Sequence, residues 1–174
     1  PEHLKRAFRL VGEVVFAFDG DRAGRAAAWR ALQNALPEVR EGRQLRFLFL
    51  PDGEDPDTLV GKEGKEAFEA RLDAALPLSE YLVRELTSQT DLGNADGRAR
   101  FAAAARPLVA KVPEGVYREL LIERLAESIK LPAARLAELW ANEAGAPESS
   151  RAAANNGGNA FGGGGSGGGR VARS

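Results

Sequence analysis

The sequence predicts an α/β layer with a parallel sheet and flanking helices, then a small all-α part and a disordered Gly-rich tail. Three observations support this fold class. Helical and strand-like segments alternate in the first part, four helical stretches follow without a strand, and the last part is dominated by Gly, Ser and Asn. We therefore divide the chain into residues 1–76, 77–146 and 147–174.

The alternating part contains two predicted strands. Residues 13–18, EVVFAF, are almost all apolar, which is typical of a parallel strand buried on both faces, and residues 42–51 form the second strand. Helices are expected over residues 2–10, 22–36 and 65–76. Two strands make a small sheet, and the chain has no methionine, so we expect it to be a piece of a longer protein.

The region from residue 77 is predicted to form a small bundle of four helices, several of which begin with Pro, Ser or Asp. Tyr117, Leu120, Leu121 and Leu125 show the i, i+3, i+4 pattern of a helix with one apolar side, and Arg124 is the exception in that pattern. Pro107 lacks an amide proton and is predicted to kink or split the second helix. The tail cannot bury a core, and we expect it to be disordered.

Composition excludes several kinds of site. The chain has no cysteine and a single histidine, His3, so disulfides, thiolate zinc sites and histidine-based catalytic triads are not expected. The formal net charge of -1 lacks the strongly basic signature of a nucleic-acid grip. No apolar run approaches the length that spans a membrane, and the simplest expectation is a cytoplasmic protein.

Carboxylates follow both predicted strands. The first strand leads into Asp19 and Asp21, and the second leads into Asp52, Glu54, Asp55 and Asp57. Because the carboxyl ends of parallel strands meet at one edge of a sheet, both groups are expected in one crevice, where functional residues gather. Carboxylates this close repel one another unless a cation lies between them, and Mg²⁺ prefers such oxygen ligands. The pattern favours a magnesium site at this edge.

Other interpretations of the same residues stay open. Arg22 and Arg25 lie in the first turn of the next helix, where they can contact phosphate oxygens. Asp21 and Asp57 are also suitable N-caps for the helices that follow them. A phosphoryl acceptor, as in haloacid-dehalogenase-like phosphatases, is less favoured because Ala23 stands where those enzymes usually carry Thr or Val.

The motifs DGDRAGR and LPDGEDPD, with the helical segments PLSEYLV, DGRARF and PLVAKVP, closely resemble bacterial replicative DNA primases, the DnaG family. The resemblance runs from near Pro1 to about Leu131 and implies the second half of a Toprim domain followed by a helical subdomain and a linker. It implies that Asp19 and Asp21 are catalytic. It further implies a Mg²⁺ site, with Mn²⁺ as a substitute, whose ligands are Asp19, Asp21, Asp55 and Asp57.

The activity implied by the resemblance is synthesis of a short RNA primer by metal-dependent ribonucleotidyl transfer. The implied partners are single-stranded DNA template, ribonucleoside triphosphates, the RNA primer, and a replicative helicase that binds through a C-terminal domain absent from this chain. Zinc is expected only in another absent domain. The Toprim glutamate of an earlier strand has no match, since Glu13 precedes the wrong strand, so we expect no primer synthesis by this chain alone.

Two alternatives to the primase interpretation remain. One is another Toprim enzyme, such as a topoisomerase or a nuclease. The other is a non-catalytic module in which the helices dock a replication partner and the carboxylates serve only as helix caps. Metal affinity that depends on Asp19 would separate the enzyme interpretation from the docking module.

Overall fold

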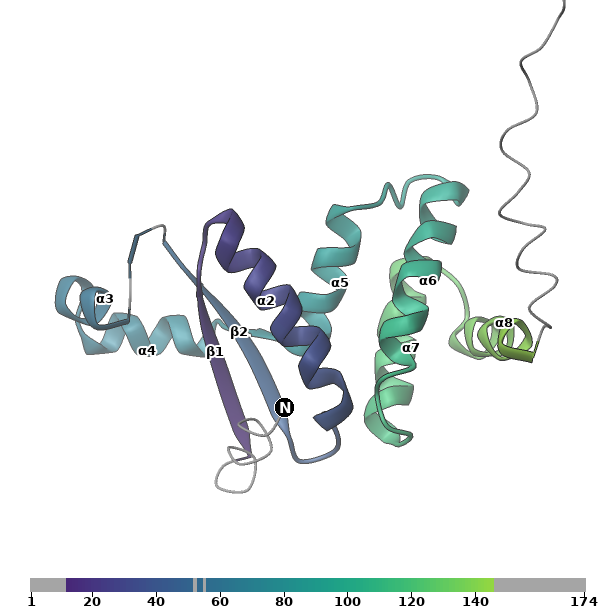
Figure 1. Cartoon of the computed structure of the whole chain (residues 1–174), viewed down its shortest axis with the longest axis horizontal. Coiled ribbons are helices and arrows are strands. Elements are labelled where there is room, and N and C mark those ends of the chain that lie inside the picture. Colours follow the sequence, from purple (N-terminus) through teal and green to yellow (C-terminus); the bar gives the residue numbers. More distant parts are fainter. Residues whose placement is uncertain (1–11, 52, 55, 146–174) are drawn as a thin grey trace, which may run out of the picture. The chain divides into compact units, whose positions relative to one another are not determined.

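The computed structural model describes residues 12–51, 53–54 and 56–145 (Figure 1). The chain up to Glu138 forms one compact unit, and Leu139 begins a second. The elements in chain order are β1 (Glu13–Asp19), α2 (Arg22–Ala35), a 3₁₀ helix (Leu36–Glu38), β2 (Gln44–Leu50), α3 (Pro56–Glu63), α4 (Lys65–Asp73), β3 (Leu76–Pro77), α5 (Leu78–Ser88), α6 (Ala95–Val109), α7 (Val116–Ser128) and α8 (Ala133–Gly145). The helix predicted over residues 2–10 and the predicted tail lie outside the described residues.

The sheet is mixed, whereas the sequence predicted only parallel strands. Its order is β1-β2-β3, with β1 and β2 parallel as expected. The short strand β3 adds antiparallel pairs between Arg46 and Pro77 and between Phe47 and Leu76. A strand of two residues has no alternating pattern, so sequence periodicity could not reveal β3.

Strand β1 is less buried than predicted. Glu13, Ala17 and Asp19 are exposed, and the residues between them are half-buried. In the described part of the chain β1 is an edge strand, paired only with β2. The central strand β2 carries the deeper core, with Phe47 at 1% exposure. An apolar run therefore identified the strand correctly but overstated its burial.

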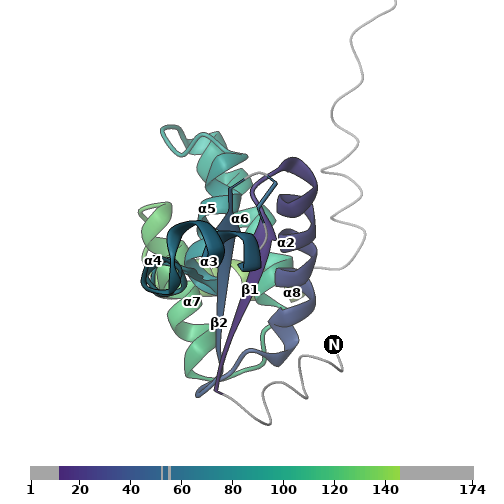
Figure 2. The ribbon, with the colours of Figure 1, turned by 90° about the vertical axis from the view of Figure 1, so that its left-hand side faces the viewer.

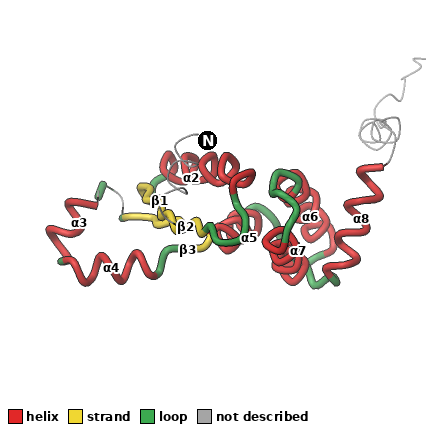
Figure 3. The backbone as a smooth tube through the Cα atoms, turned by 90° about the horizontal axis from the view of Figure 1, so that it is seen from below, coloured by secondary structure: helices red, strands yellow, loops and turns green. Residues whose placement is uncertain are grey.

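The two faces of the sheet are covered by different helices. On one face the rings of Phe16, Phe18, Phe47 and Phe49 form a cluster, which Tyr81 of α5 joins with a centroid distance of 4.7 Å to Phe47. The other face presents a second apolar cluster, made of Val15, Leu48, Leu50, Leu59, Phe68, Leu72 and Ala75. Helices α2 and α4 accordingly lie on opposite sides of the sheet (Figures 2 and 3).

The helix predicted over residues 22–36 is confirmed as α2, and its apolar spacing places Leu32 and Leu36 fully inside the core. The chain tightens into a 3₁₀ turn at Leu36–Glu38, which contains Pro37. Proline fits the first turn of a helix because its missing amide proton has no intrahelical partner there.

The four predicted helices of the second part are confirmed as α5 to α8, with two corrections. Pro107 does not split α6, which continues to Val109, two residues beyond the proline. Leu120 does not face the core and is 57% exposed. The buried face of α7 includes Leu121 and Leu125, and Leu120 lies outside this face.

A bidentate ion pair joins α5 to α7. Arg124 Nε donates to Glu80 Oε1 at 2.7 Å, and Nη2 donates to Oε2 at 3.0 Å. The side-chain hydrogen bonds from Arg124 lower the pKa of the Glu80 carboxyl. Because both side chains are more than one-third exposed, the pair is worth about 1 kcal/mol or less.

This ion pair predicts a pH-dependent stability difference. A carboxyl with a lowered folded-state pKa stabilises the fold above its unfolded value of about 4.3, and that contribution is lost as the pH falls through the folded value. Glu80→Gln should therefore lower the free energy of unfolding at pH 7 and change it little below the folded pKa. Urea unfolding of the parent chain and of Glu80→Gln, from pH 7 to below the folded pKa of Glu80, measures this difference. A stability difference that stays the same at every pH would contradict the prediction.

Candidate metal centre

The turn after β1 holds the first pair of carboxylates. Asp19 is the last residue of β1, and Asp21 is the N-cap of α2. Asp21 Oδ1 accepts a hydrogen bond from Gly24 N at 2.6 Å, so the capping interpretation of Asp21 is confirmed. The capping bond does not remove the carboxylate charge of Asp21. The second carboxylate oxygen takes no part in this bond. The cap therefore orients the carboxylate without removing it as a candidate ligand.

Gly24 brings the first turn of α2 into contact with the end of β1. A Cβ atom at this position would lie 2.0 Å from the carbonyl oxygen of Asp19, far inside van der Waals contact. Only glycine permits this approach, which places the positive end of α2 beside Asp19 and Asp21. The sequence pattern alone gives no sign of this close approach, although the motif DGDRAGR contains Gly24.

The second pair of carboxylates follows β2 at the same edge. Asp19 pairs in register with Leu50, so the loop after β2 begins where the turn after β1 begins. This confirms that the two acidic segments leave one edge of the sheet. Asp57 lies in the first turn of α3 and is exposed; it is not the N-cap, because α3 already begins at Pro56. Asp55 lies outside the described residues.

Glu54, at the same edge, has an unusual environment. Its Oε1 forms an ion pair with Lys62, while its Oε2 is buried without a hydrogen-bond partner in the structure. The side chain is 18% exposed. A buried carboxylate oxygen without a donor is the kind of atom that a cation can satisfy. Glu54 belonged to the acidic loop in the sequence analysis, but its type and spacing alone did not mark it as a ligand.

The described carboxylates do not form a complete metal site. In residues 12–51, 53–54 and 56–145, no three Asp, Glu, His or Cys side chains converge to hold an ion. The ligand set of Asp19, Asp21, Asp55 and Asp57 includes one residue outside these ranges and stays a prediction. The chemistry of the donors suits Mg²⁺, because each is a carboxylate and Mg²⁺ prefers oxygen ligands.

The two arginines proposed to contact phosphate differ in their surroundings. Arg22 is the first residue of α2 and is exposed. Arg25 is also exposed, but its Nε donates to the carbonyl oxygen of Gly20 at 3.1 Å. Arg25 therefore holds the turn between Asp19 and Asp21 in place while its remaining guanidinium nitrogens stay outside this bond.

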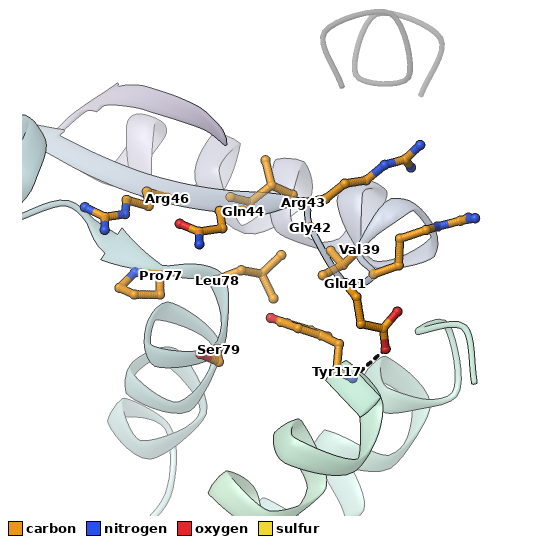
Figure 4. A pocket seen from close by; sticks show the side chains of 12 residues that line it. Val39, Glu41, Gly42, Arg43, Gln44, Arg46, Pro77, Leu78, Ser79 and Tyr117 are labelled. Carbon is orange, nitrogen blue, oxygen red and sulfur yellow. Dashed lines mark hydrogen bonds between the residues drawn. The ribbon is translucent and has the colours of Figure 1, made fainter. Parts of the chain in front are cut away.

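A hollow lies at the end of β2 that is opposite to the acidic edge (Figure 4). It has a volume of about 360 Å³ and is lined by the loop before β2 and by the first turns of α5 and α7. Glu41 Oε1 accepts from Tyr117 N at 3.2 Å, and hydrogen bonds from the amides of Glu41 and Tyr117 lower the pKa of the Glu41 carboxyl. Burial raises the pKa of Tyr117 to about 12. The hydrogen bond between Tyr117 and Glu41 joins the loop before β2 to α7, away from the acidic edge.

Comparison with known proteins identifies two family regions. Residues 1–50 match the Toprim domain, and residues 79–133 match the DnaB-helicase binding domain of primase. The second match lies within this chain, whereas the sequence predicted helicase binding only through a further C-terminal domain. In the described residues no helix has both the length and the apolar character needed to cross a membrane.

The chain is similar to bacterial DNA primases over most of its length. It is 55% identical to the DNA primase of Escherichia coli K12 over 128 residues, which cover 74% of this chain but 22% of that protein. A solved DNA primase domain from Pseudomonas aeruginosa matches with a TM-score of 0.74 and 47% identity, covering 80% of this chain and 44% of that one.

A solved DnaG primase catalytic domain bound to single-stranded DNA matches equally well, with a TM-score of 0.74 and 51% identity over 77% of this chain and 43% of that one. The chain thus spans less than half of each relative. The chain therefore belongs to the bacterial DnaG family of DNA primases, of which it forms a segment.

Proposed function

We propose that this chain supplies the metal-binding edge of a primase active site, which joins ribonucleotides into a short RNA primer on a single-stranded DNA template. The observation that carries the proposal is the register of β1 and β2, in which Asp19 lies opposite Leu50 and both acidic segments leave one edge. Family membership supports it, because the relatives are DNA primases. A topoisomerase or nuclease is not favoured by these matches.

In this proposal Asp19, Asp21, Asp55 and Asp57 hold Mg²⁺, or Mn²⁺ in its place, and Asp19 and Asp21 are catalytic. When bound, the ion would neutralise charge on the phosphoryl group that is transferred. The chain's own contribution is orientation: the cap at Gly24 N fixes Asp21, and Arg25 fixes the carbonyl of Gly20. Arg22 and Arg25 contribute positive charge toward nucleotide or nucleic-acid phosphates.

The test replaces the matching segment of E. coli DNA primase with residues 1–131 of this chain. If the proposal holds, the hybrid synthesises RNA primers on single-stranded DNA in a Mg²⁺-dependent way. The same hybrid with Asp19→Asn should lose this activity while remaining folded. A folded hybrid that binds DNA but makes no primers would contradict the proposal.

Because we propose a role in replication, the expected compartment is the cytoplasm.

A helicase contact is the second element of the proposal, since residues 79–133 match a helicase-binding family. Within this region α7 exposes two apolar side chains one helical turn apart, Val116 at 62% and Leu120 at 57% exposure. Covering exposed apolar side chains with a partner removes their surface from water, which favours association. We propose that they contact a replicative helicase of the DnaB type.

Replacing both side chains, Val116→Ser with Leu120→Ser, should weaken helicase binding by about tenfold, since two apolar contacts are lost. The matched control is Val60→Ser, an exposed valine of α3 outside the matched region. Binding to purified helicase can be measured by biolayer interferometry. Equal affinities for the double variant and the control would show that α7 is not the contact surface.

A further inference from the structure

The exposed side of α7 carries apolar and acidic side chains in one line. Four exposed residues recur at positions i, i+4, i+7 and i+11, a spacing that places them along one side of a helix: Val116, Leu120, Glu123 and Glu127. We call these residues the α7 stripe. The buried residues of α7, such as Leu125, lie on the opposite side, where the helix packs against α5 and α6. The stripe is therefore not used by the fold of the described residues.

The first half of the α7 stripe is apolar. Val116 and Leu120, at 62% and 57% exposure, are the two most exposed large apolar side chains in the described part of the chain. Val60 and Leu139 follow at 39% and 38% and lie on other helices. Because Val116 and Leu120 are one helical turn apart, a single recess on a partner can cover both and remove their surface from water.

The second half of the α7 stripe is acidic. Glu119, at the margin of the stripe, Glu123 and Glu127 follow one another at intervals of four residues. Like charges at this spacing weaken a helix, so the row does not stabilise α7. Among the described residues, Glu119 and Glu123 form no ion pair, and Glu127 only reaches Arg124 Nη1 at 4.0 Å. Their negative charge is therefore open to a partner.

Helix α7 is fixed near both ends. Its N-cap, Gly115, has no side chain to cap the helix, and Glu41 Oε1 instead accepts a hydrogen bond from Tyr117 N at 3.2 Å. Further along the helix, Arg124 donates two hydrogen bonds to Glu80 of α5. A partner that binds the stripe therefore meets a helix that is already ordered, which reduces the conformational entropy lost on binding.

We propose that the α7 stripe docks onto a replicative helicase at a surface where an apolar recess lies beside Lys or Arg side chains. Val116 and Leu120 enter the recess, and Glu123 and Glu127 face the basic side chains. This charge complementarity speeds the encounter and fixes the direction of α7 on the partner. The inference deepens the helicase contact proposed above, on which it rests for the identity of the partner.

The same charges argue against two other occupants of the stripe. Nucleic acid is repelled, since its phosphates carry the same sign as the glutamates. A second copy of this chain is also poorly matched. A two-fold contact between two stripes would place Glu123 and Glu127 against the same glutamates or against apolar side chains. A partner with basic side chains beside an apolar recess fits both halves.

The experiment measures association and dissociation rates of the full chain with a purified DnaB-type helicase by biolayer interferometry at several salt concentrations. Glu123→Gln plus Glu127→Gln removes two charges and keeps the side-chain shape. At low salt this variant should associate about tenfold more slowly, with little change in dissociation, because exposed charges mainly steer the encounter. Between about 0.05 and 0.5 M salt the difference should disappear through screening.

The matched control is Glu66→Gln plus Glu69→Gln, which changes the net charge equally at two exposed glutamates of α4, outside the matched region. It should associate as the parent chain does. The stripe variant should keep its fold by circular dichroism, because repulsion within α7 is relieved. Val116→Ser plus Leu120→Ser should instead stay weaker at high salt, since salt does not screen an apolar contact.

Three results would overturn the inference, and they differ in what else they affect. If the glutamine variant associates like the α4 control at low salt while the serine variant still binds more weakly, the helicase contact stands and only the charge complementarity fails. If the parent chain binds no helicase, both proposals fail. If analytical ultracentrifugation shows self-association that Val116→Ser plus Leu120→Ser abolishes, the stripe belongs to an interface between copies of this chain.

Discussion

The double variant Asp19→Asn plus Asp21→Asn is expected to lose Mn²⁺ affinity by at least about 100-fold while keeping its fold, since even indirect partners of metal ligands contribute 10- to 100-fold. Asparagine removes the charge but keeps a side-chain oxygen, so the cap at Gly24 N is retained. Both carboxylates belong to one turn beside the positive end of α2, and neutralising them removes the strongest local attraction for a cation.

Manganese binding can be followed by electron paramagnetic resonance, with circular dichroism to confirm the fold. The matched control is Asp73→Asn plus Asp96→Asn, which removes two exposed carboxylates from other elements and should leave Mn²⁺ binding unchanged. A folded parent chain that binds no Mn²⁺ would contradict the proposed metal edge. Unfolding of Asp21→Ala together with unchanged Mn²⁺ binding by the asparagine variant would favour a capping role alone.

The geometry of this edge could largely be predicted from the sequence. Two apolar runs, each followed by acidic residues, predicted parallel strands with a shared carboxyl end, and the pairing of Asp19 with Leu50 confirms it. Such an inference works because strand direction and crossover hand follow from local pattern and chain length. The cap at Asp21 was predictable for the same reason, since capping depends on residue type within one turn.

Features set by tertiary contact could not be predicted in the same way. The exposure of Leu120 depends on which side of α7 meets α5 and α6, and the helical spacing of leucines does not specify it. The environments of Glu54 and Tyr81 depend on burial of single oxygen atoms. Both residues lie in motifs that carry the family resemblance, but residue type and spacing do not show which oxygen atoms are buried. Only packing therefore distinguishes them from an ordinary loop acid and an ordinary core tyrosine.

Gly24→Ala is expected to destabilise the fold by about 2 kcal/mol, in the range for overpacking a close contact. The new methyl group would lie 2.0 Å from the carbonyl oxygen of Asp19, and 2.8 Å from its carbon, so backbone atoms must move. A flexible side chain could rotate away from such a contact, but a strand end cannot. Relief of the clash therefore requires α2 to shift away from β1, which also moves Asp21 relative to Asp19.

Gly61→Ala is the matched control, because a Cβ atom at this helical glycine of α3 meets nothing within 4 Å. This substitution should raise stability by about 0.5–1 kcal/mol through helix propensity. Urea unfolding of the two variants thus predicts changes of opposite sign, and Mn²⁺ affinity should fall only in Gly24→Ala. If both alanines raised stability alike, the contact between α2 and the end of β1 would be looser than 2.0 Å implies, and Gly24 would not position the carboxylate pair.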